Sequence, residues 1–327
     1  MALGTSSSLA PFRIEPRFVG RVWGFRDLRP WYDRVVAEGD DPIGEVWLTG
    51  DANLVATGPF AGKRLDAVFA EAGRELLGER APETASPLLA KMLFAADKLS
   101  VQVHPDDRMA QKYGEPRGKT ECWYALAAEP GAKMAVGLKQ GVTLDEVKAQ
   151  IAAGTLEQSL NAVEVKAGDM IFVDAGTVHA IWPGAIILET QQNCDLTYRM
   201  YDYGRPRELH VEKSLEATRL ATRAGKVAPV ELAGRTVLID EAYFRVERVP
   251  VKGSISSEAL RGHRPAELAY VFTAAGAARI EGEGFEPVEL PARSIAAIPA
   301  ASPSFQVVDL GGLDLIRMMP NWPESAQ

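Results

Sequence analysis

The length, composition and charge of this chain limit what it can be. Its 327 residues are 46% hydrophobic and 24% charged, which suits a sizeable core in one large domain or two smaller ones. The net charge of −8 argues against nucleic acid or an anionic membrane as partner, because both attract basic proteins, but a small anionic substrate fits a locally basic pocket. With two cysteines, no signal-peptide core and no apolar run of about 18 residues, we expect a cytoplasmic protein with reduced thiols.

The N-terminal part of the chain is expected to supply packing rather than chemistry. Residues 1–16 are predicted to form a loose arm, and residues 46–50 a strand that ends in a turn. From Arg64 onward, apolar residues recur at helical spacing until Gly78, which predicts a helix.

The segment LSVQVH, residues 99–104, alternates between apolar and polar residues. A β-strand with this pattern sends Ser100, Gln102 and His104 to one face and the apolar residues to the other. Pro105 then ends the strand.

Two later segments bring further polar side chains to the same place. The segment KTECWY alternates similarly and places Lys119, Glu121 and Trp123 on one face of a neighbouring strand. Residues 168–181 predict a turn, a short strand, a second turn and a returning strand whose His179 points inward.

His104, Glu121 and His179 together predict a metal site. Imidazole and carboxylate ligands suit Zn²⁺ and other divalent first-row metals, and three protein ligands with an open position are typical of a catalytic site. Gln102 can add its amide oxygen as a fourth ligand. We expect one divalent ion per chain, with zinc as the expected metal. The alternative for either histidine alone is a hydrogen-bonded core residue.

Helices are predicted at two further places. An insertion of two helices is expected around residues 140–162, and one more helix over residues 211–224. The insertion carries two possible capping boxes, Thr143 with Glu146 and Thr155 with Gln158.

Residues 186–203 predict two strands with a bend near residues 193–195. The second strand carries Arg199, and a basic turn follows it. A buried arginine requires an anionic partner, because an unpaired buried charge is costly. From the residues alone, a structural salt bridge with Glu189 or Asp202 is the alternative to a role in substrate binding.

Residues 226–327 contain short apolar runs separated by Gly and Pro turns, which indicates a second β-sandwich. Its histidine, His263, has no second His or Glu at ligand spacing, so we expect this domain to be metal-free.

Several of these motifs resemble known families. Residues 168–179 are similar to the second cupin motif, G-x5-P-x-G-x2-H, with Asp174 where that motif has proline. The ordered motifs QVHPDD, GKTECWY, AGTVHAI and LTYRMYDYGR resemble those of type I mannose-6-phosphate isomerases, in particular the shorter bacterial form. The resemblance covers residues 17–215 well and the rest weakly. It implies a mainly β, double-cupin fold, with a catalytic metal-binding domain over residues 17–225 and a C-terminal domain over residues 226–327.

The resemblance also implies a function and the residues that carry it. The expected reaction interconverts mannose 6-phosphate and fructose 6-phosphate through an enediol. Arg199 matches the family's active-site arginine, and Ser100 a position that contacts the substrate phosphate. Lys119 and Arg199 are available for oxyanion stabilisation and phosphate binding. The base is open between Lys119, an acidic residue and metal-bound water, with Lys119 as the first choice.

Two alternatives come from other functional classes, because cupins host many functions. A cupin oxygenase would use similar ligands with iron, and a sugar-binding or regulatory cupin would keep the pocket without turnover. The expected partner is a small sugar phosphate, and the expected state is a monomer or a homodimer.

Overall fold

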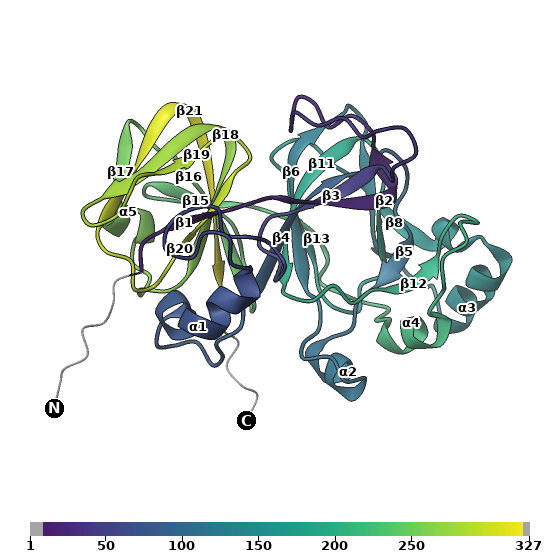
Figure 1. The fold of residues 1–327 in the computed structure, drawn as a ribbon. Coiled ribbons are helices and arrows are strands. Elements are labelled where there is room, and N and C mark those ends of the chain that lie inside the picture. Colours follow the sequence, from purple (N-terminus) through teal and green to yellow (C-terminus); the bar gives the residue numbers. More distant parts are fainter. Residues whose placement is uncertain (1–8, 323–327) are drawn as a thin grey trace. The chain divides into compact units, whose positions relative to one another are not determined.

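A computed structural model describes residues 9–322, and the chain divides into two compact units (Figure 1). Each unit is assembled from segments that are distant in the sequence. Unit 2 consists of Phe18–Val46 and Ala90–Ala228, and unit 1 of the chain up to Arg17, Trp47–Leu89 and the segment from Pro229 onward.

The division into units differs from the predicted domains. Residues 47–89 were predicted to belong to the domain of residues 17–225, but they group with the C-terminal segment in unit 1. Their helix α1 (Leu65–Leu77) accepts backbone hydrogen bonds there, from Ala300 to Leu76 at 2.8 Å and from Ala301 to Glu75 at 3.0 Å. The predicted helix itself is confirmed, and Gly78 caps it with a φ of 90°.

The predicted N-terminal arm also needs correction. Residues 1–8 lie outside the described residues, but strand β1 (Phe12–Ile14) pairs with β20 (Ile295–Ile298). Phe12 and Ile14 are buried, so burial of apolar side chains fixes this segment to unit 1.

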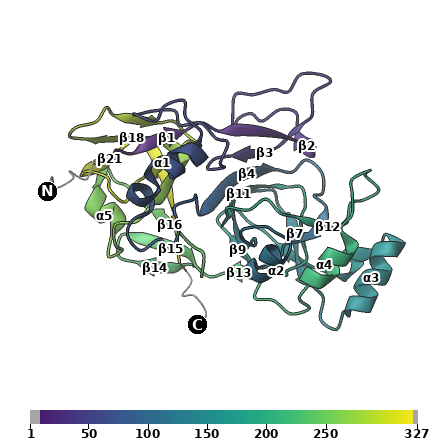
Figure 2. The ribbon, with the colours of Figure 1, turned by 60° about the horizontal axis from the view of Figure 1, so that its bottom comes forward.

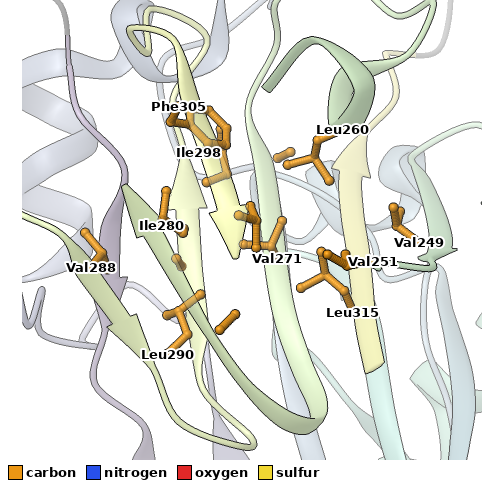
Figure 3. Packing of buried hydrophobic residues seen from close by; sticks show 14 of the residues in the cluster. Val249, Val251, Leu260, Val271, Ile280, Val288, Leu290, Ile298, Phe305 and Leu315 are labelled. Atoms are coloured by element: carbon orange, nitrogen blue, oxygen red, sulfur yellow. The ribbon is translucent and has the colours of Figure 1, made fainter. Parts of the chain in front are cut away.

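Unit 1 is built on one nine-stranded sheet with the order β1-β20-β18-β21-β16-β15-β14, to which β17 and β19 add at β21 and β18. Its buried core is a cluster of aliphatic side chains and Phe305 (Figure 3). The remaining elements of the unit are β14 (Val230–Leu232), β15 (Arg235–Asp240), β16 (Phe244–Val249), β17 (Ser254–Ser256), α5 (Ser257–Arg261), β18 (Ala269–Gly282), β19 (Val288–Leu290) and β21 (Phe305–Pro320).

Unit 2 contains two sheets. The five-stranded sheet has the order β12-β5-β10-β7-β8, and the seven-stranded sheet the order β13-β9-β6-β11-β4-β3-β2. The strands of the first sheet are β5 (Val101–Val103), β7 (Lys133–Leu138), β8 (Leu160–Glu164), β10 (His179–Ile181) and β12 (Tyr198–Tyr201). Those of the second are β2 (Arg17–Phe25), β3 (Ile43–Trp47), β4 (Leu88–Phe94), β6 (Glu121–Ala128), β9 (Met170–Val173), β11 (Ala185–Gln192) and β13 (Gly225–Val227).

The helices of unit 2 cover one face of the five-stranded sheet. They are α2 (Asp107–Lys112), α3 (Leu144–Ala153) and α4 (Val211–Ala217), and α3 and α4 lie side by side (Figure 2). Val147 and Ile151 of α3 join Val101 and Val103 of β5 in one apolar cluster. Because strand residues alternate between faces, this packing leaves Ser100, Gln102 and His104 for the opposite face.

The helical predictions for unit 2 are confirmed only in part. The capping box of Thr143 with Glu146 is present, but Thr155 makes no capping hydrogen bond and precedes only a short 3-10 turn, η1 (Leu156–Ser159). Helix α4 ends at Ala217 rather than at residue 224, because Arg219 turns back to donate its backbone N–H to Gly176. Across residues 9–322, no helix is long and apolar enough to cross a membrane.

Candidate metal centre and active site

Three neighbouring strands of the five-stranded sheet align polar side chains in one row. Gln102 of β5 is the Cα partner of His179 in β10 on one side and of Arg199 in β12 on the other. The turn before β10 contains Gly176 at φ 90°, where a Cβ would approach the Arg219 side chain to 2.7 Å. Glycine therefore permits the tight return that places His179 beside Gln102.

His104, Glu121 and His179 converge as predicted. One ligand atom from each lies within 4.8 Å of the others, and all three residues are buried. Oε1 of Glu121 is 3.4 Å from Nε2 of His179, and Oε2 is 3.7 Å from Nε2 of His104. Glu121 reaches this point from the seven-stranded sheet, so the two sheets of unit 2 together form the site.

Backbone carbonyls fix the tautomer of both imidazoles. Nδ1 of His104 lies 2.9 Å from the carbonyl oxygen of Leu196, and Nδ1 of His179 lies 2.9 Å from that of Thr177. A carbonyl only accepts, so each Nδ1 carries the proton and each Nε2 has a lone pair that can bind a metal, as in a metal-ligating histidine. Burial lowers the pKa of His104 well below its ordinary value and that of His179 to about 4, which keeps both rings neutral.

The donor atoms fit a divalent metal ion. Nε2 of His104 and Oε2 of Glu121 are buried without a hydrogen-bond partner among the described residues, although the Lys119 ammonium lies 2.9 Å from that oxygen. An unpaired buried polar atom costs free energy of about 1–3 kcal/mol, so the unpartnered Nε2 of His104 beside the Glu121 carboxylate indicates a function. A cation that accepts lone pairs from all three residues would satisfy both atoms.

Gln102 adjoins the candidate metal-ligating set, the name we use for His104, Glu121 and His179. Its Nε2 is 3.2 Å from Nε2 of His179, and Ser100 donates a hydrogen bond of 3.3 Å to its Oε1. In this orientation the amide nitrogen of Gln102 faces the lone pair on Nε2 of His179. A turn of the amide by half a rotation would present its oxygen instead.

Lys119 and Glu189 form the charged wall of the site. Lys119 is buried between Glu121, at 2.9 Å, and Glu189, at 3.9 Å. Burial alone would lower the pKa of Lys119, but the attraction of these carboxylates outweighs it and raises the pKa above the ordinary value. Burial and repulsion from Glu121 raise the pKa of Glu189. Two adjacent buried carboxylates thus leave the site short of positive charge.

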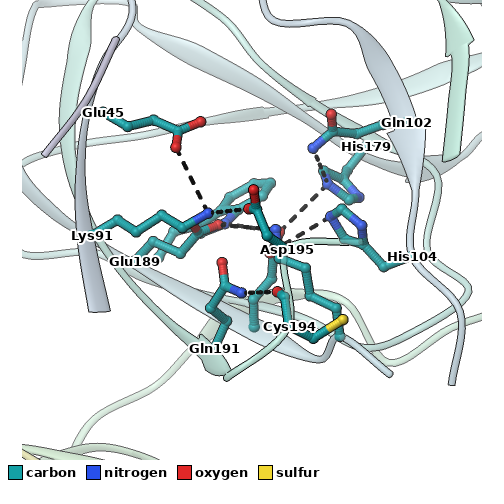
Figure 4. Close-up of polar contacts among 12 residues, drawn as sticks. Glu45, Lys91, Gln102, His104, His179, Glu189, Gln191, Cys194 and Asp195 are labelled. Atoms are coloured by element: carbon teal, nitrogen blue, oxygen red, sulfur yellow. Dashed lines mark hydrogen bonds and ion pairs between the residues drawn. The ribbon is translucent and has the colours of Figure 1, made fainter. Parts of the chain in front are cut away.

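A second ion network, which the sequence analysis did not identify, lies beside the first. Lys91 is 2% exposed and its ammonium contacts Asp195 at 2.6 Å, Glu45 at 3.8 Å and Glu189 at 3.9 Å (Figure 4). Burial opposes protonation of Lys91, but the attraction of Glu45 and Asp195 outweighs it and raises the pKa. The sequence signal was a lysine inside the fully buried strand β4.

Arg199 lines the same space and forms no ion pair with any residue between 9 and 322. Its Nη1 donates to the backbone carbonyl of Glu208 at 2.8 Å, and its Nε is buried without a hydrogen-bond partner among the described residues. The alternative of a structural salt bridge with Glu189 or Asp202 is wrong. Asp202 pairs with Arg205 and Arg207, and Glu189 pairs with Lys91 and Lys119. Arg199 is therefore available to an anionic ligand.

A cavity of about 410 Å³ in unit 2 joins these groups. Its volume suits a small molecule, and charged side chains dominate its lining. His263 belongs to unit 1 and His210 contacts the backbone of Arg199, so neither histidine joins the metal-ligating set. The cavity is lined by Arg21, Trp23, Glu45, Lys91, Leu93, Leu99, Ser100, Gln102, Lys119, Glu121, Ile181, Glu189, Asp195, Leu196, Thr197, Arg199 and Arg207.

Known proteins resemble this chain over most of its length. Residues 12–142 match the family profile "Phosphomannose isomerase type I, catalytic domain". A mannose-6-phosphate isomerase of Streptococcus mutans is 36% identical over 261 residues, which cover 76% of this chain and 81% of that protein. The ManA mannose-6-phosphate isomerase of Bacillus subtilis is 35% identical over 289 residues, covering 84% of this chain and 86% of that protein.

The fold agrees with the sequence matches. A crystal structure of the mannose 6-phosphate isomerase from Bacillus subtilis superposes with a TM-score of 0.82 at 29% identity, covering 95% of this chain and 99% of that chain. This match confirms the mainly β, double-cupin fold that the sequence predicted. The chain belongs to the type I phosphomannose isomerase family.

Proposed function

We propose that this chain is a metal-dependent isomerase that interconverts mannose 6-phosphate and fructose 6-phosphate through an enediol. The observation that carries the proposal is the buried set of His104, Glu121 and His179, in which Nε2 of His104 has no hydrogen-bond partner within residues 9–322. This set adjoins a cavity lined by five cationic and four acidic side chains. A polarising cation and a positively charged pocket are what an anionic sugar and its enediolate require.

His104, Glu121 and His179 would hold one ion per chain, for which zinc suits the imidazole and carboxylate donors. Gln102 would add its amide oxygen after rotation of the amide. When bound, the ion supplies Lewis-acid polarisation of the O1 and O2 oxygens of the sugar. The neighbouring protein groups then bind the substrate and move its proton.

Lys119 is our candidate for the proton transfer between C1 and C2. It is buried, and its ammonium lies next to Glu121, so it reaches the space where the reacting carbons would lie. A positive charge that neutralised Glu121 would remove the main attraction that raises the pKa of Lys119. Lys119 would then exchange a proton more readily.

Arg199 would stabilise the negative charge of the enediolate and contribute to substrate binding. Its guanidinium forms no ion pair among the described residues, so no competing carboxylate has to be displaced. Ser100, on the Gln102 face of its strand, would contact the substrate phosphate. A cytoplasmic location and a monomeric or dimeric state stay predictions from the sequence.

The test is a coupled assay with mannose 6-phosphate, run beside metal analysis of the same preparation. We expect steady formation of fructose 6-phosphate and close to one divalent ion per chain. Sugar-phosphate binding without turnover would instead favour a binding protein. Turnover of another substrate that requires dioxygen and iron would favour an oxygenase.

A further inference from the structure

The loop after β12 folds two arginines, Arg205 and Arg207, around one carboxylate, Asp202. Tyr203 and Gly204 have φ values of 55° and 81°, and these two left-handed residues reverse the chain directly after Asp202. The reversal brings Arg205 and Arg207 back to Asp202, which is only 3% exposed. A non-glycine residue at positive φ is uncommon and persists where the surrounding contacts fix it.

Asp202 accepts two hydrogen bonds from the Arg207 guanidinium. Nε of Arg207 donates to Oδ2 at 2.7 Å, and Nη2 donates to Oδ1 at 2.7 Å, which is the fork geometry that fixes a guanidinium in one plane. Arg205 contacts the same carboxylate but also donates to the backbone carbonyl of Lys98 at 2.7 Å, and it does not line the cavity. Arg207 does line the cavity, so Asp202 aims this one guanidinium at the ligand space.

The cations at this end of the cavity outnumber their carboxylate partners. Asp202 serves both Arg205 and Arg207, and Arg199 forms no ion pair among residues 9–322. Burial, and then electrostatic repulsion from Arg207, lower the pKa of Arg199, so the two guanidiniums are close enough to repel each other. A doubly charged anion between them would convert this repulsion into attraction.

The strand register places this pair of arginines away from the metal-ligating set. Arg199 is one strand from Gln102 and two strands from His179, at a spacing of about 4.8 Å per strand. Tyr201 pairs with Val101, so the ladder brings Asp202 to the Ser100 end of β5. Across the sheet the order is therefore His179, Gln102 and Arg199, and the loop that carries Arg207 follows the Arg199 strand.

We propose that Arg207 is a further substrate-binding residue, which clamps the phosphate of the substrate together with Arg199, and that Asp202 is a positioning residue for Arg207. The proposal rests on the proposed function, because it takes a sugar phosphate as substrate whose C1 and C2 lie at the metal-ligating set. The phosphate on C6 then reaches the opposite, arginine-rich end. Arg207 contacts the phosphate equally in the ground state and in the transition state, so it contributes to affinity rather than to turnover.

The test combines steady-state kinetics on mannose 6-phosphate with calorimetric binding of inorganic phosphate. We expect Arg207→Ala to raise KM about 10- to 100-fold, since a hydrogen bond to a charged group is lost, while kcat stays within about threefold of wild type. Arg207→Lys should recover part of the affinity, because it keeps the charge without the fork. Asp202→Asn should raise KM less than Arg207→Ala does, with kcat again unchanged.

Phosphate binding separates this proposal from the proposed function. Wild-type protein should bind inorganic phosphate with similar affinity with and without the metal, and Arg207→Ala should weaken that binding about tenfold or more. Arg108→Ala removes an exposed arginine outside the cavity and serves as the matched control, with no change in either measurement. Thermal unfolding of each variant confirms that it is folded.

The outcomes have distinct meanings. A folded Arg207→Ala protein with unchanged KM and unchanged phosphate affinity would overturn the proposal, as would a fall in kcat at constant KM. A wild-type protein that fails to isomerise mannose 6-phosphate, yet loses phosphate affinity on Arg207→Ala, would refute the proposed reaction and support the phosphate site.

Discussion

The two units bury charged groups in opposite ways. In unit 1, Glu247 is fully buried and accepts hydrogen bonds from Arg235 at 3.0 Å, Arg245 at 2.7 Å and Arg317 at 3.3 Å. In unit 2, the buried Glu121 lies beside a second carboxylate and leaves an oxygen without a hydrogen bond among the described residues.

The difference separates a structural network from a site for a ligand. A carboxylate surrounded by arginines needs nothing further. By contrast, Glu121 and Glu189 share the Lys119 ammonium beside an Nε2 of His104 that has no partner within residues 9–322, so this site can take up a further positive charge. Similar β architectures thus carry a satisfied ion network in one unit and an incomplete one in the other. Variants in unit 1 should accordingly lose stability, whereas variants in unit 2 should lose bound metal and turnover.

The largest effect is expected at the metal-ligating histidines. Because each Nε2 supplies one of three donors, His104→Ala or His179→Ala should remove the bound ion and reduce turnover to background. Metal analysis and the coupled assay on the same folded protein measure this. Retention of a stoichiometric ion in either variant would show that the unpartnered atoms of unit 2 have another role.

Arg199→Ala should lower kcat about 10²- to 10³-fold if its guanidinium meets charge that develops only in the enediolate. Arg199→Lys should recover little, because lysine lacks the planar fork of donors. Steady-state kinetics on metal-loaded enzyme decide the matter. A raised KM at wild-type kcat would show that Arg199 binds only the substrate phosphate, together with Arg207, and does not stabilise the enediolate charge.

In unit 1, Glu247→Gln should affect stability and not the reaction. Removing the charge leaves buried arginines such as Arg317 without a counter-ion, at a cost of about 3–5 kcal/mol in the free energy of unfolding. Glu289→Gln breaks the exposed pair with Arg279 and is the matched control, with a loss below about 1 kcal/mol. Denaturant unfolding gives both values. Equal losses would contradict a stabilising network around Glu247.

The smallest effect is expected at His263. His263→Ala should leave the metal content at one ion per chain and change kcat only slightly, because the sequence offers this histidine no second ligand at suitable spacing. Loss of a stoichiometric ion from this variant would place a metal site in unit 1 and remove the contrast between the units.

The sequence revealed the parts of this molecule that follow a local pattern. Alternation in a half-buried strand singled out His104, and Glu121 followed from the same period of two. His179 followed from the glycine turns that precede its short returning strand. Lys91 was not identified, and Glu189 was named only as a possible partner of Arg199, because β4 and β11 are buried along their whole length, where alternation carries no information.

Long-range pairing explains the remaining differences. Strand β1 pairs with β20, a partner near the other end of the chain, so the membership of residues 9–16 in unit 1 has no local signal. Helix α4 was predicted too long because the apolar spacing continues past Ala217, whereas a backbone hydrogen bond to Gly176 turns the chain there. Both choices depend on distant partners that local periodicity does not contain.

The central claim is that the ligand atoms of His104, Glu121 and His179 hold a metal ion that the isomerisation requires. The most direct measurement removes the metal by exhaustive chelation, restores it in steps, and follows turnover of mannose 6-phosphate against bound metal per chain. The account predicts negligible turnover without metal and a linear recovery that reaches its plateau at about one zinc ion per chain. Full turnover in metal-free protein would contradict it.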